Sequence, residues 1–448
     1  MPARVLLIAL DGADSELLER WSGDGTLPSL AAMRARGRSA RVDAPAGITD
    51  DGLWASLQYS CGLGEHGRYH HRQRRRDGTF GIASVDESMM PRFWDKLSDA
   101  GYRTAIIDVP KCAPPRPMNG IHLADWEVHG RYAGQPHSFP AELAGDVVAR
   151  FGAAPPSRCG HELEELSDAE VLETLAWLER SVAQKRDAAL HLLAGEAWDV
   201  FVVGFKEAHC AGHSLWNLAD AEHPDHDAQR SARLGNPMLR IMRVLDAAVG
   251  DLVEASGPDA EVVVFSTSRI VPNGSLEHLM PEVVERLNVA LGYRGFSRRL
   301  RQLTGRPPPI EMLPYNENCA ALRVNGGRSI AEAAIRIFSE MSAPETGEPA
   351  FSRIDRPSQV EHGPRAAQLP DILLHYKPGL MPVALKSPRL GTFGAAAPHL
   401  RPGNHAPGLF FISEGRRAGS ITGPGALEDF GPFIERLLAA DAKAASAP

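Results

Sequence analysis

The pattern of apolar and polar residues predicts a buried parallel strand near the start of the chain. Six apolar residues run from Val5 to Leu10 without the alternation of a half-exposed strand. Continuous runs of this kind are typical of strands covered by helices on both faces. The run stops at Asp11, and residues 15–21 then follow a helical pattern. Asp11 is therefore expected at the carboxyl edge of a sheet, where open α/β folds place their sites.

Strands and helices then alternate along the chain. Further apolar runs that predict buried strands cover residues 103–109, 198–205 and 260–268. The helical patterns near them cover residues 93–101, 166–193 and 239–253. This alternation predicts an α/β fold, with a doubly wound, mainly parallel sheet and helices on both of its faces.

The simple alternation is lost between residues 273 and 364, a stretch that we expect to form an inserted cap. Apolar runs at residues 370–376 and 408–413 are expected to return to the central sheet. The predicted organisation is a first part of the core at 1–272, the cap at 273–364, a last part of the core at 365–440, and a frayed tail at 441–448.

Composition and charge narrow the classes of function. The chain has 448 residues, 43% of them hydrophobic, which is enough to bury a large core. A net charge of -8 does not support binding to a nucleic acid polymer. The five cysteines are scattered without CxxC spacing, as in proteins of a reducing compartment. No apolar run reaches the length of a signal-peptide core or a membrane span, so we expect a cytoplasmic protein without a membrane partner.

Polar residues that follow predicted strands are the first candidates for chemistry. Thr49 and Asp50 lie in a loop that leads into a helix, and they could equally serve as helix caps, as could Asp11. His209 and His213 follow the strand at 198–205, and two histidines four residues apart can converge on a metal ion. A purely structural role for the pair is the alternative.

Further motifs occur in a consistent order along the chain. They lie at residues 10–14, 54–56, 66–67, 93–97, 107–110, 212–213, 316–325, 346–349, 370–372 and 403–405. Their order and spacing resemble the alkaline phosphatase superfamily, in its type I phosphodiesterase/nucleotide pyrophosphatase branch. The resemblance implies an alkaline-phosphatase-like fold with two metal ions at the carboxyl edge of the sheet.

The resemblance also implies roles for individual residues. Asp11 matches the family's early aspartate ligand, His213 its middle histidine and His405 its final histidine. Two positions depart from the family pattern. His209 stands where the family has an aspartate, and Thr267-Ser268 stands where it has an aspartate followed by a histidine.

The position of the family's nucleophile is ambiguous in this chain. Counting back from Trp54 leads to Asp50, whereas one inserted residue leads to Thr49. The family uses a threonine or serine hydroxyl here, which needs a cation to lower its pKa. Both residues are therefore candidate catalytic groups.

The departures predict one metal ion in place of two. Without the aspartate–histidine pair, Asp11 and one uncertain partner make a poor divalent site. His209, His213 and His405 form an altered second site. Three neutral imidazoles suit Zn²⁺ and leave it an open position, an arrangement that lowers the pKa of bound water to about 7. Zinc is the expected ion, with manganese or iron as alternatives.

The sequence therefore predicts a metal-dependent hydrolase or transferase that acts on a phosphoester, phosphodiester or nucleotide-like, or on a related ester. Attack would come from water or hydroxide on the metal, or from Asp50 or Thr49. The expected partner is a small anionic substrate. The alternative is a catalytically degenerate family member that binds an anionic ligand or partner without turnover. No repeat or coiled-coil pattern indicates an oligomeric state.

Overall fold

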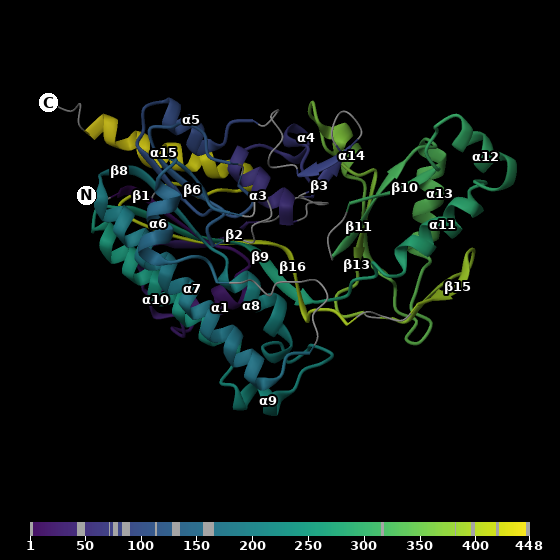
Figure 1. Ribbon diagram of the computed structural model, residues 1–448, viewed down its shortest axis with the longest axis horizontal. Helices are drawn as coiled ribbons and strands as arrows, with labels where there is room; N and C mark the ends of the chain where they lie inside the picture. The colour runs from purple at the N-terminus through teal and green to yellow at the C-terminus, as the bar shows by residue number, and fades with distance from the viewer. Residues whose placement is uncertain are drawn as a thin grey trace.

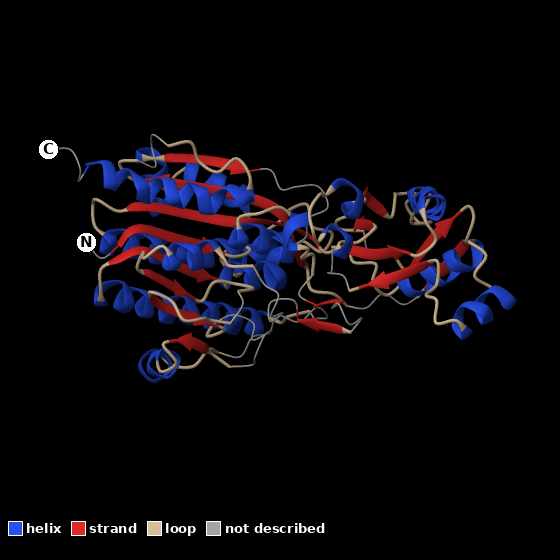
Figure 2. Ribbon diagram, turned by 90° about the horizontal axis from the view of Figure 1, so that it is seen from above, coloured by secondary structure: helices blue, strands red, loops and turns tan. Residues whose placement is uncertain are grey.

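The structure of the protein is a computed structural model with a larger and a smaller lobe (Figure 1). Seen from above, the larger lobe contains the long strands, and the smaller lobe extends from one end of it (Figure 2). The residues that the structure describes are 3–42, 50–70, 72–74, 79–82, 90–112, 114–127, 135–155, 165–314, 318–380, 382–395, 399–417 and 421–444.

The larger lobe is built on an eight-stranded sheet with the order β2-β16-β9-β1-β8-β5-β6-β7. In chain order, the strands are β1 (Ala3–Leu10), β2 (Arg38–Val42), β5 (Thr104–Ile107), β6 (Gly120–Ala124), β7 (His137–Phe139), β8 (Trp198–Phe205), β9 (Glu261–Pro272) and β16 (Gly403–Glu414). The five strands from β9 to β6 pair in parallel, and antiparallel pairs occur at both edges. The predicted mainly parallel sheet is confirmed.

Helices cover both faces of this sheet, which explains the continuous apolar run in β1. Leu6 and Ile8 pack into the core on one face, and Val5 and Leu7 into the core on the other. The first face carries α1 (Ser15–Gly23), α2 (Pro28–Arg36), α6 (Leu143–Phe151), α7 (Asp168–Gly195), α8 (Glu207–Leu215) and α10 (Pro237–Ser256). The second face carries α3 (Asp50–Tyr59), α5 (Phe93–Asp99) and α15 (Phe430–Ala444).

The smaller lobe has its own sheet and its own core. Its four antiparallel strands, in the order β10-β11-β13-β12, are β10 (Ile310–Leu313), β11 (Cys319–Val324), β12 (Phe351–Asp355) and β13 (Ile372–Tyr376). Helices α11 (Met280–Ala290), α12 (Gly295–Leu303) and α13 (Arg328–Ser339) belong to this lobe, as does the hairpin of β14 (Ala384–Ser387) and β15 (Gly391–Gly394). One apolar cluster joins side chains from Leu276 to Phe393.

Short elements complete the described chain. They are α4 (Leu63–His66), the hairpin of β3 (Arg72–Arg74) and β4 (Phe80–Ile82), α9 (Ala228–Arg233) and α14 (Pro357–Val360). Among the described helices, none combines the length and apolar character that crossing a membrane requires.

One expected strand lies in the other sheet. The expectation that residues 370–376 belong to the central sheet is wrong, because β13 pairs with β11 and β12. The reason is physical: a buried apolar run looks the same whichever sheet covers it. We infer that the inserted lobe extends beyond the predicted boundary at residue 364, since Leu385 and Phe393 lie in its core. The run at 408–413 does lie in the central sheet, within β16.

Candidate metal centre

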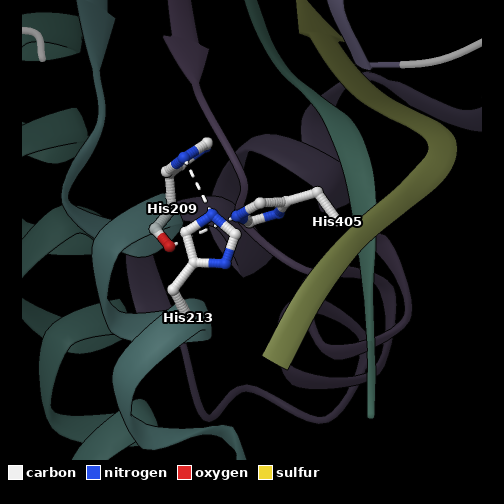
Figure 3. A group of neighbouring side chains, drawn as sticks. All are labelled: His209, His213 and His405. Carbon is white, nitrogen blue, oxygen red and sulfur yellow. Dashed lines mark hydrogen bonds between the residues drawn. The ribbon is translucent and has the colours of Figure 1, made fainter. Parts of the chain in front are cut away.

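Three histidines from two segments, α8 and β16, meet at the carboxyl edge of the central sheet. His209 and His213 are one helical turn apart on α8, which begins directly after β8, and so they share a face of that helix. His405 is on β16, opposite Ile270 of β9. Figure 3 shows the three rings turned toward one another. All three side chains are buried.

The geometry of the three rings is compact. The Nε2 atoms of His209 and His213 are 3.1 Å apart. The ring of His405 stacks on that of His209, with centroids 4.1 Å apart, and lies edge-on to that of His213 at 4.3 Å. One ligand nitrogen from each residue falls within 4.8 Å of the other two, and this is the potential metal-binding group found in the described part of the chain.

One nitrogen of each ring lies close to a protein oxygen, and these oxygens favour particular tautomers of the neutral rings. Nδ1 of His213 is 2.8 Å from the carbonyl oxygen of Gly403, and Nδ1 of His209 is 3.3 Å from Oδ2 of Asp11. Nε2 of His405 is 3.3 Å from the carbonyl oxygen of His209. Where such an oxygen accepts a hydrogen bond from a neutral ring, the opposite nitrogen of that ring carries a lone pair.

This arrangement fits a cation. The Nε2 atoms of His209 and His213 are within hydrogen-bond distance, so one neutral ring can donate to the other, or both lone pairs can bind one metal ion. Nitrogens bound to a tetrahedral zinc ion at about 2.05 Å lie about 3.3 Å apart. The second ring nitrogen of a metal-binding histidine is commonly held by a carbonyl or carboxylate, as here. The three residues can therefore hold zinc.

Gly12 allows the centre to close. It has a φ of +65°, and a Cβ atom at this position would lie 2.4 Å from Cα of His209 and 2.6 Å from Cε1 of His405. Any larger residue would push the two histidines apart. The glycine after Asp11 is thus required both by the backbone conformation and by the close approach of the rings.

Asp11 lies beside the three histidines, but its oxygens are engaged by protein groups. Oδ1 accepts a hydrogen bond of 3.0 Å from Nε1 of Trp54, and Oδ2 faces His209. Its backbone nitrogen donates to the carbonyl oxygen of Phe205, which fastens the end of β1 to the end of β8. This geometry favours a role in orienting His209, and direct ligation by Asp11 stays a prediction.

The positions that match the family's aspartate–histidine pair lie inside a strand. β9 continues to Pro272, so Thr267 and Ser268 lie within the strand and not at its end. Their hydroxyl oxygens are 3.3 Å apart, and both residues are buried. Ser268 pairs with Pro407 of β16. These hydroxyls lie where β9 pairs with β16, and two neutral hydroxyls are weak ligands for a metal ion.

The candidate nucleophiles are only partly covered by the structure. Thr49 lies outside the described residues, and Asp50 is described as the first residue of α3 but not in its side chain. The next residue, Asp51, forms a nearly buried ion pair with Lys111, with 3.3 Å between Oδ1 and Nζ. Lys111 follows β5 at the same sheet edge, and its position was not recognisable from the sequence.

A serine of α3 and a histidine of α4 form a pair that resembles a catalytic dyad. Oγ of Ser56 is 2.9 Å from Nε2 of His66, but Nδ1 of His66 accepts from the backbone nitrogen of Arg68 at 2.9 Å. Nε2 therefore carries the proton and donates it to Ser56. Burial lowers the pKa of His66 to about 3, so the ring stays neutral. This pair is structural.

A buried ionic network anchors the start of α8. Nζ of Lys206 is 3.4 Å from Glu127 and 3.7 Å from Glu207, and Nζ of Lys185 is 2.9 Å from Asp108. Burial alone would raise the pKa of Glu207, but Lys185 and Lys206 outweigh burial and lower it. Glu207 is thus held as a carboxylate two residues before His209, where it fixes the first turn of the helix.

Comparison with known proteins identifies the family. The profile of the type I phosphodiesterase/nucleotide pyrophosphatase family matches residues 5–279. The chain belongs to this family. A search of curated proteins gave no match. Membership places the chain among the phosphoester hydrolases, as the resemblance implied.

Solved structures support the fold of this type I phosphodiesterase family member. Phosphonoacetate hydrolase from Sinorhizobium meliloti 1021 superposes with a TM-score of 0.56 at 13% identity, covering 97% of this chain and 96% of that one. Alkaline phosphatase PafA gives 0.53 at 13%, covering 98% and 96%. Murine ectonucleotide pyrophosphatase/phosphodiesterase 5 gives 0.51 at 11%, covering 98% and 95%. At these identities the likeness shows the alkaline-phosphatase-like fold.

Proposed function

We propose that the protein hydrolyses a small phosphoester with a single metal ion, zinc by preference, held by His209, His213 and His405. The observation that carries this proposal is the arrangement of the nitrogen atoms of the three rings. Each ring has one nitrogen held by a protein oxygen, and the other nitrogens belong to a group that can share one ion. Family members are metal-dependent and usually use zinc.

The residues of the centre would perform complementary tasks. Zinc bound by three imidazoles supplies a Lewis acid that polarises a phosphoryl oxygen and lowers the pKa of coordinated water. Asp11 would hold His209 in the binding tautomer, and the Gly403 carbonyl would do the same for His213. Asp50, the first residue of α3, or Thr49, which precedes it in the sequence, would supply a group that attacks phosphorus or orients water for attack.

A small anionic phosphoester is the substrate class that we propose. Two of the proteins with this fold were solved with small phosphorus-containing anions: the phosphonate phosphonoacetate in the Sinorhizobium hydrolase and the phosphoester AMP in the murine phosphodiesterase. In this chain, Lys111 is a nearly buried cation at the same edge of the sheet as the centre. It adds positive charge near the place where an anionic group would bind.

Turnover of a nitrophenyl phosphodiester tests this proposal. We expect the zinc-loaded protein to release nitrophenol, and chelation or His213→Ala to reduce the rate by more than about a hundredfold, because a ligand is lost. His191→Ala is a matched control, since His191 is an exposed histidine on α7. An unchanged rate in the His213 variant would refute the proposed role of the centre.

The second candidate function is binding without turnover. It is favoured by one observation, the replacement of the family's aspartate–histidine pair by Thr267 and Ser268 within β9. In that case the purified protein would bind a phosphate monoester or diester, whether or not it holds zinc, but it would turn over no substrate of the tested set. Calorimetric titration of the zinc protein with AMP, beside the nitrophenyl assay, separates the two functions.

A further inference from the structure

Helix α12 exposes apolar side chains at the tip of the smaller lobe. It lies at the end of the molecule farthest from the central sheet (Figure 1, Figure 2). Phe296 is 80% exposed, Leu300 49% and Leu303 86%, and no residue of α12 is buried. Val289, near the end of the preceding helix, is a further exposed apolar residue. The described part of the chain has eight large exposed hydrophobic residues, and these are four of them.

The exposed apolar residues form one stripe along the helix. Phe296, Leu300 and Leu303 have the spacing i, i+4, i+7, which places them on one side of an α-helix. Arg298, on the other side, attaches the helix to the lobe: its guanidinium is 2.7 Å from Glu285 and 5.7 Å from the ring centroid of Tyr293. The stripe therefore faces away from the protein.

Positive charge surrounds the stripe. Residues 294–306 contain five arginines and no acidic residue, in a chain whose net charge is -8. Arg294, Arg299 and Arg306 are exposed, and Arg301 is bound to the carbonyl oxygen of Pro307. An apolar stripe bordered by arginines is typical of helices that lie on an anionic membrane surface.

A second copy of the chain fits this surface less well. Three side chains on one nine-residue helix are far fewer than the 20–30 residues a side of a stable interface. In a two-fold dimer through α12, the arginines of both copies would also face each other. Membrane binding needs neither a large area nor a complementary protein, since a few inserted side chains and several cations are enough for reversible attachment.

We propose that α12 docks the protein on a membrane surface rich in anionic lipid, with Phe296, Leu300 and Leu303 inserted among the headgroups. This proposal revises the expectation of no membrane partner, which was based on the lack of a spanning segment. A helix that lies on the surface has no such length requirement. The interaction is independent of the metal centre, which lies in the other lobe.

Flotation of the full-length protein with lipid vesicles tests the proposal. The probes are vesicles of phosphatidylcholine with phosphatidylglycerol, and vesicles of phosphatidylcholine alone. We expect the protein to float with the anionic vesicles, to float far less with the neutral ones, and to detach as ionic strength rises. Arg299→Glu with Arg306→Glu should weaken binding by at least about twenty-five-fold, at roughly fivefold for each positive charge lost.

Removal of the apolar stripe provides an independent arm. Phe296→Ser with Leu303→Ser should weaken binding by roughly tenfold or more. Both side chains are almost fully exposed, so the variant should fold normally, which circular dichroism can verify. Val360→Ser, on α14, is the matched control because its side chain is 60% exposed elsewhere on the molecule, and it should bind like the parent.

Three outcomes would overturn the proposal. They are no flotation with anionic vesicles, equal flotation with both kinds of vesicle, and unchanged flotation of both α12 variants. Light scattering supplies a further contrary result. A dimer that Phe296→Ser with Leu303→Ser dissociates, without vesicle binding by the parent, would show that the stripe is a contact between copies of the chain.

Discussion

In one region of the site, the imidazoles of α8 and β16 lie in contact with one another. In the other region, the hydroxyls of Thr267 and Ser268 lie 3.3 Å apart within β9. The three imidazoles can share one metal ion, because each offers a nitrogen within 4.8 Å of the other two. The two hydroxyls can hydrogen-bond to each other and carry no charge. The same sheet edge thus contains one region that favours a metal ion and one that does not, although the family fold has two metal positions there.

Asp11 shows how the two regions are related. The carboxylate lies between Trp54 and His209: Oδ1 accepts a hydrogen bond from Trp54, and Oδ2 is 3.3 Å from Nδ1 of His209. His209 stands where the family has an aspartate. A neutral imidazole can lie next to the Asp11 carboxylate, whereas a second carboxylate would be repelled by it. The histidine at position 209 is therefore compatible with a role for Asp11 in orienting its ring.

The largest expected effect on turnover concerns the candidate catalytic groups Asp50 and Thr49. If Asp50 acts in catalysis, Asp50→Ala should abolish phosphodiester turnover, while Thr49→Ala keeps most of it. The opposite result would restore the family's hydroxyl nucleophile. Equal and mild effects of both changes would indicate helix capping, which contributes about 1 kcal/mol to stability. Rates and urea unfolding measured on the same preparations distinguish these cases.

A smaller effect is expected at Asp11. Asp11→Asn should reduce zinc affinity about 10- to 100-fold while one ion per chain still binds, because the carboxylate orients His209 without ligating the metal. Competition with a chromogenic chelator measures this affinity. Trp54→Phe is the control. It removes the hydrogen bond to Oδ1 of Asp11 and should change zinc affinity less. Loss of a whole equivalent of metal in Asp11→Asn would make Asp11 a ligand and contradict the account.

Several of these residues could be predicted from the sequence, and others could not. The i, i+4 spacing of His209 and His213 predicts their shared face, and the motif around His405 supplied the third histidine through the family resemblance. Trp54 belongs to a recognised motif, but its contact with Asp11 joins residues 43 positions apart and leaves no local pattern. Lys111 and Asp51 are also far apart in the sequence, so no local pattern predicts their ion pair. The strand at 372–376 was placed in the wrong sheet, because apolar periodicity reports burial and not the partner strand.

The smallest effect should come from the hydroxyl residues. Thr267→Val and Ser268→Ala should leave zinc content and turnover essentially unchanged, since neither hydroxyl is expected to ligate the metal. Each change removes one side of a buried hydrogen bond and should cost about 1 kcal/mol of unfolding free energy. Urea denaturation and elemental analysis provide the two readouts. A fall in metal content in either variant would mean that the β9 side of the site also binds an ion.

The number of metal ions per chain tests the central claim most directly. Elemental analysis of protein purified without chelator should give close to one zinc per chain, and His213→Ala should lose it. Two ions per chain would contradict the account, since the described residues near Thr267 and Ser268 would then have to form a second site. No metal, with no uptake when zinc is added, would contradict it as well and leave binding without turnover as the function.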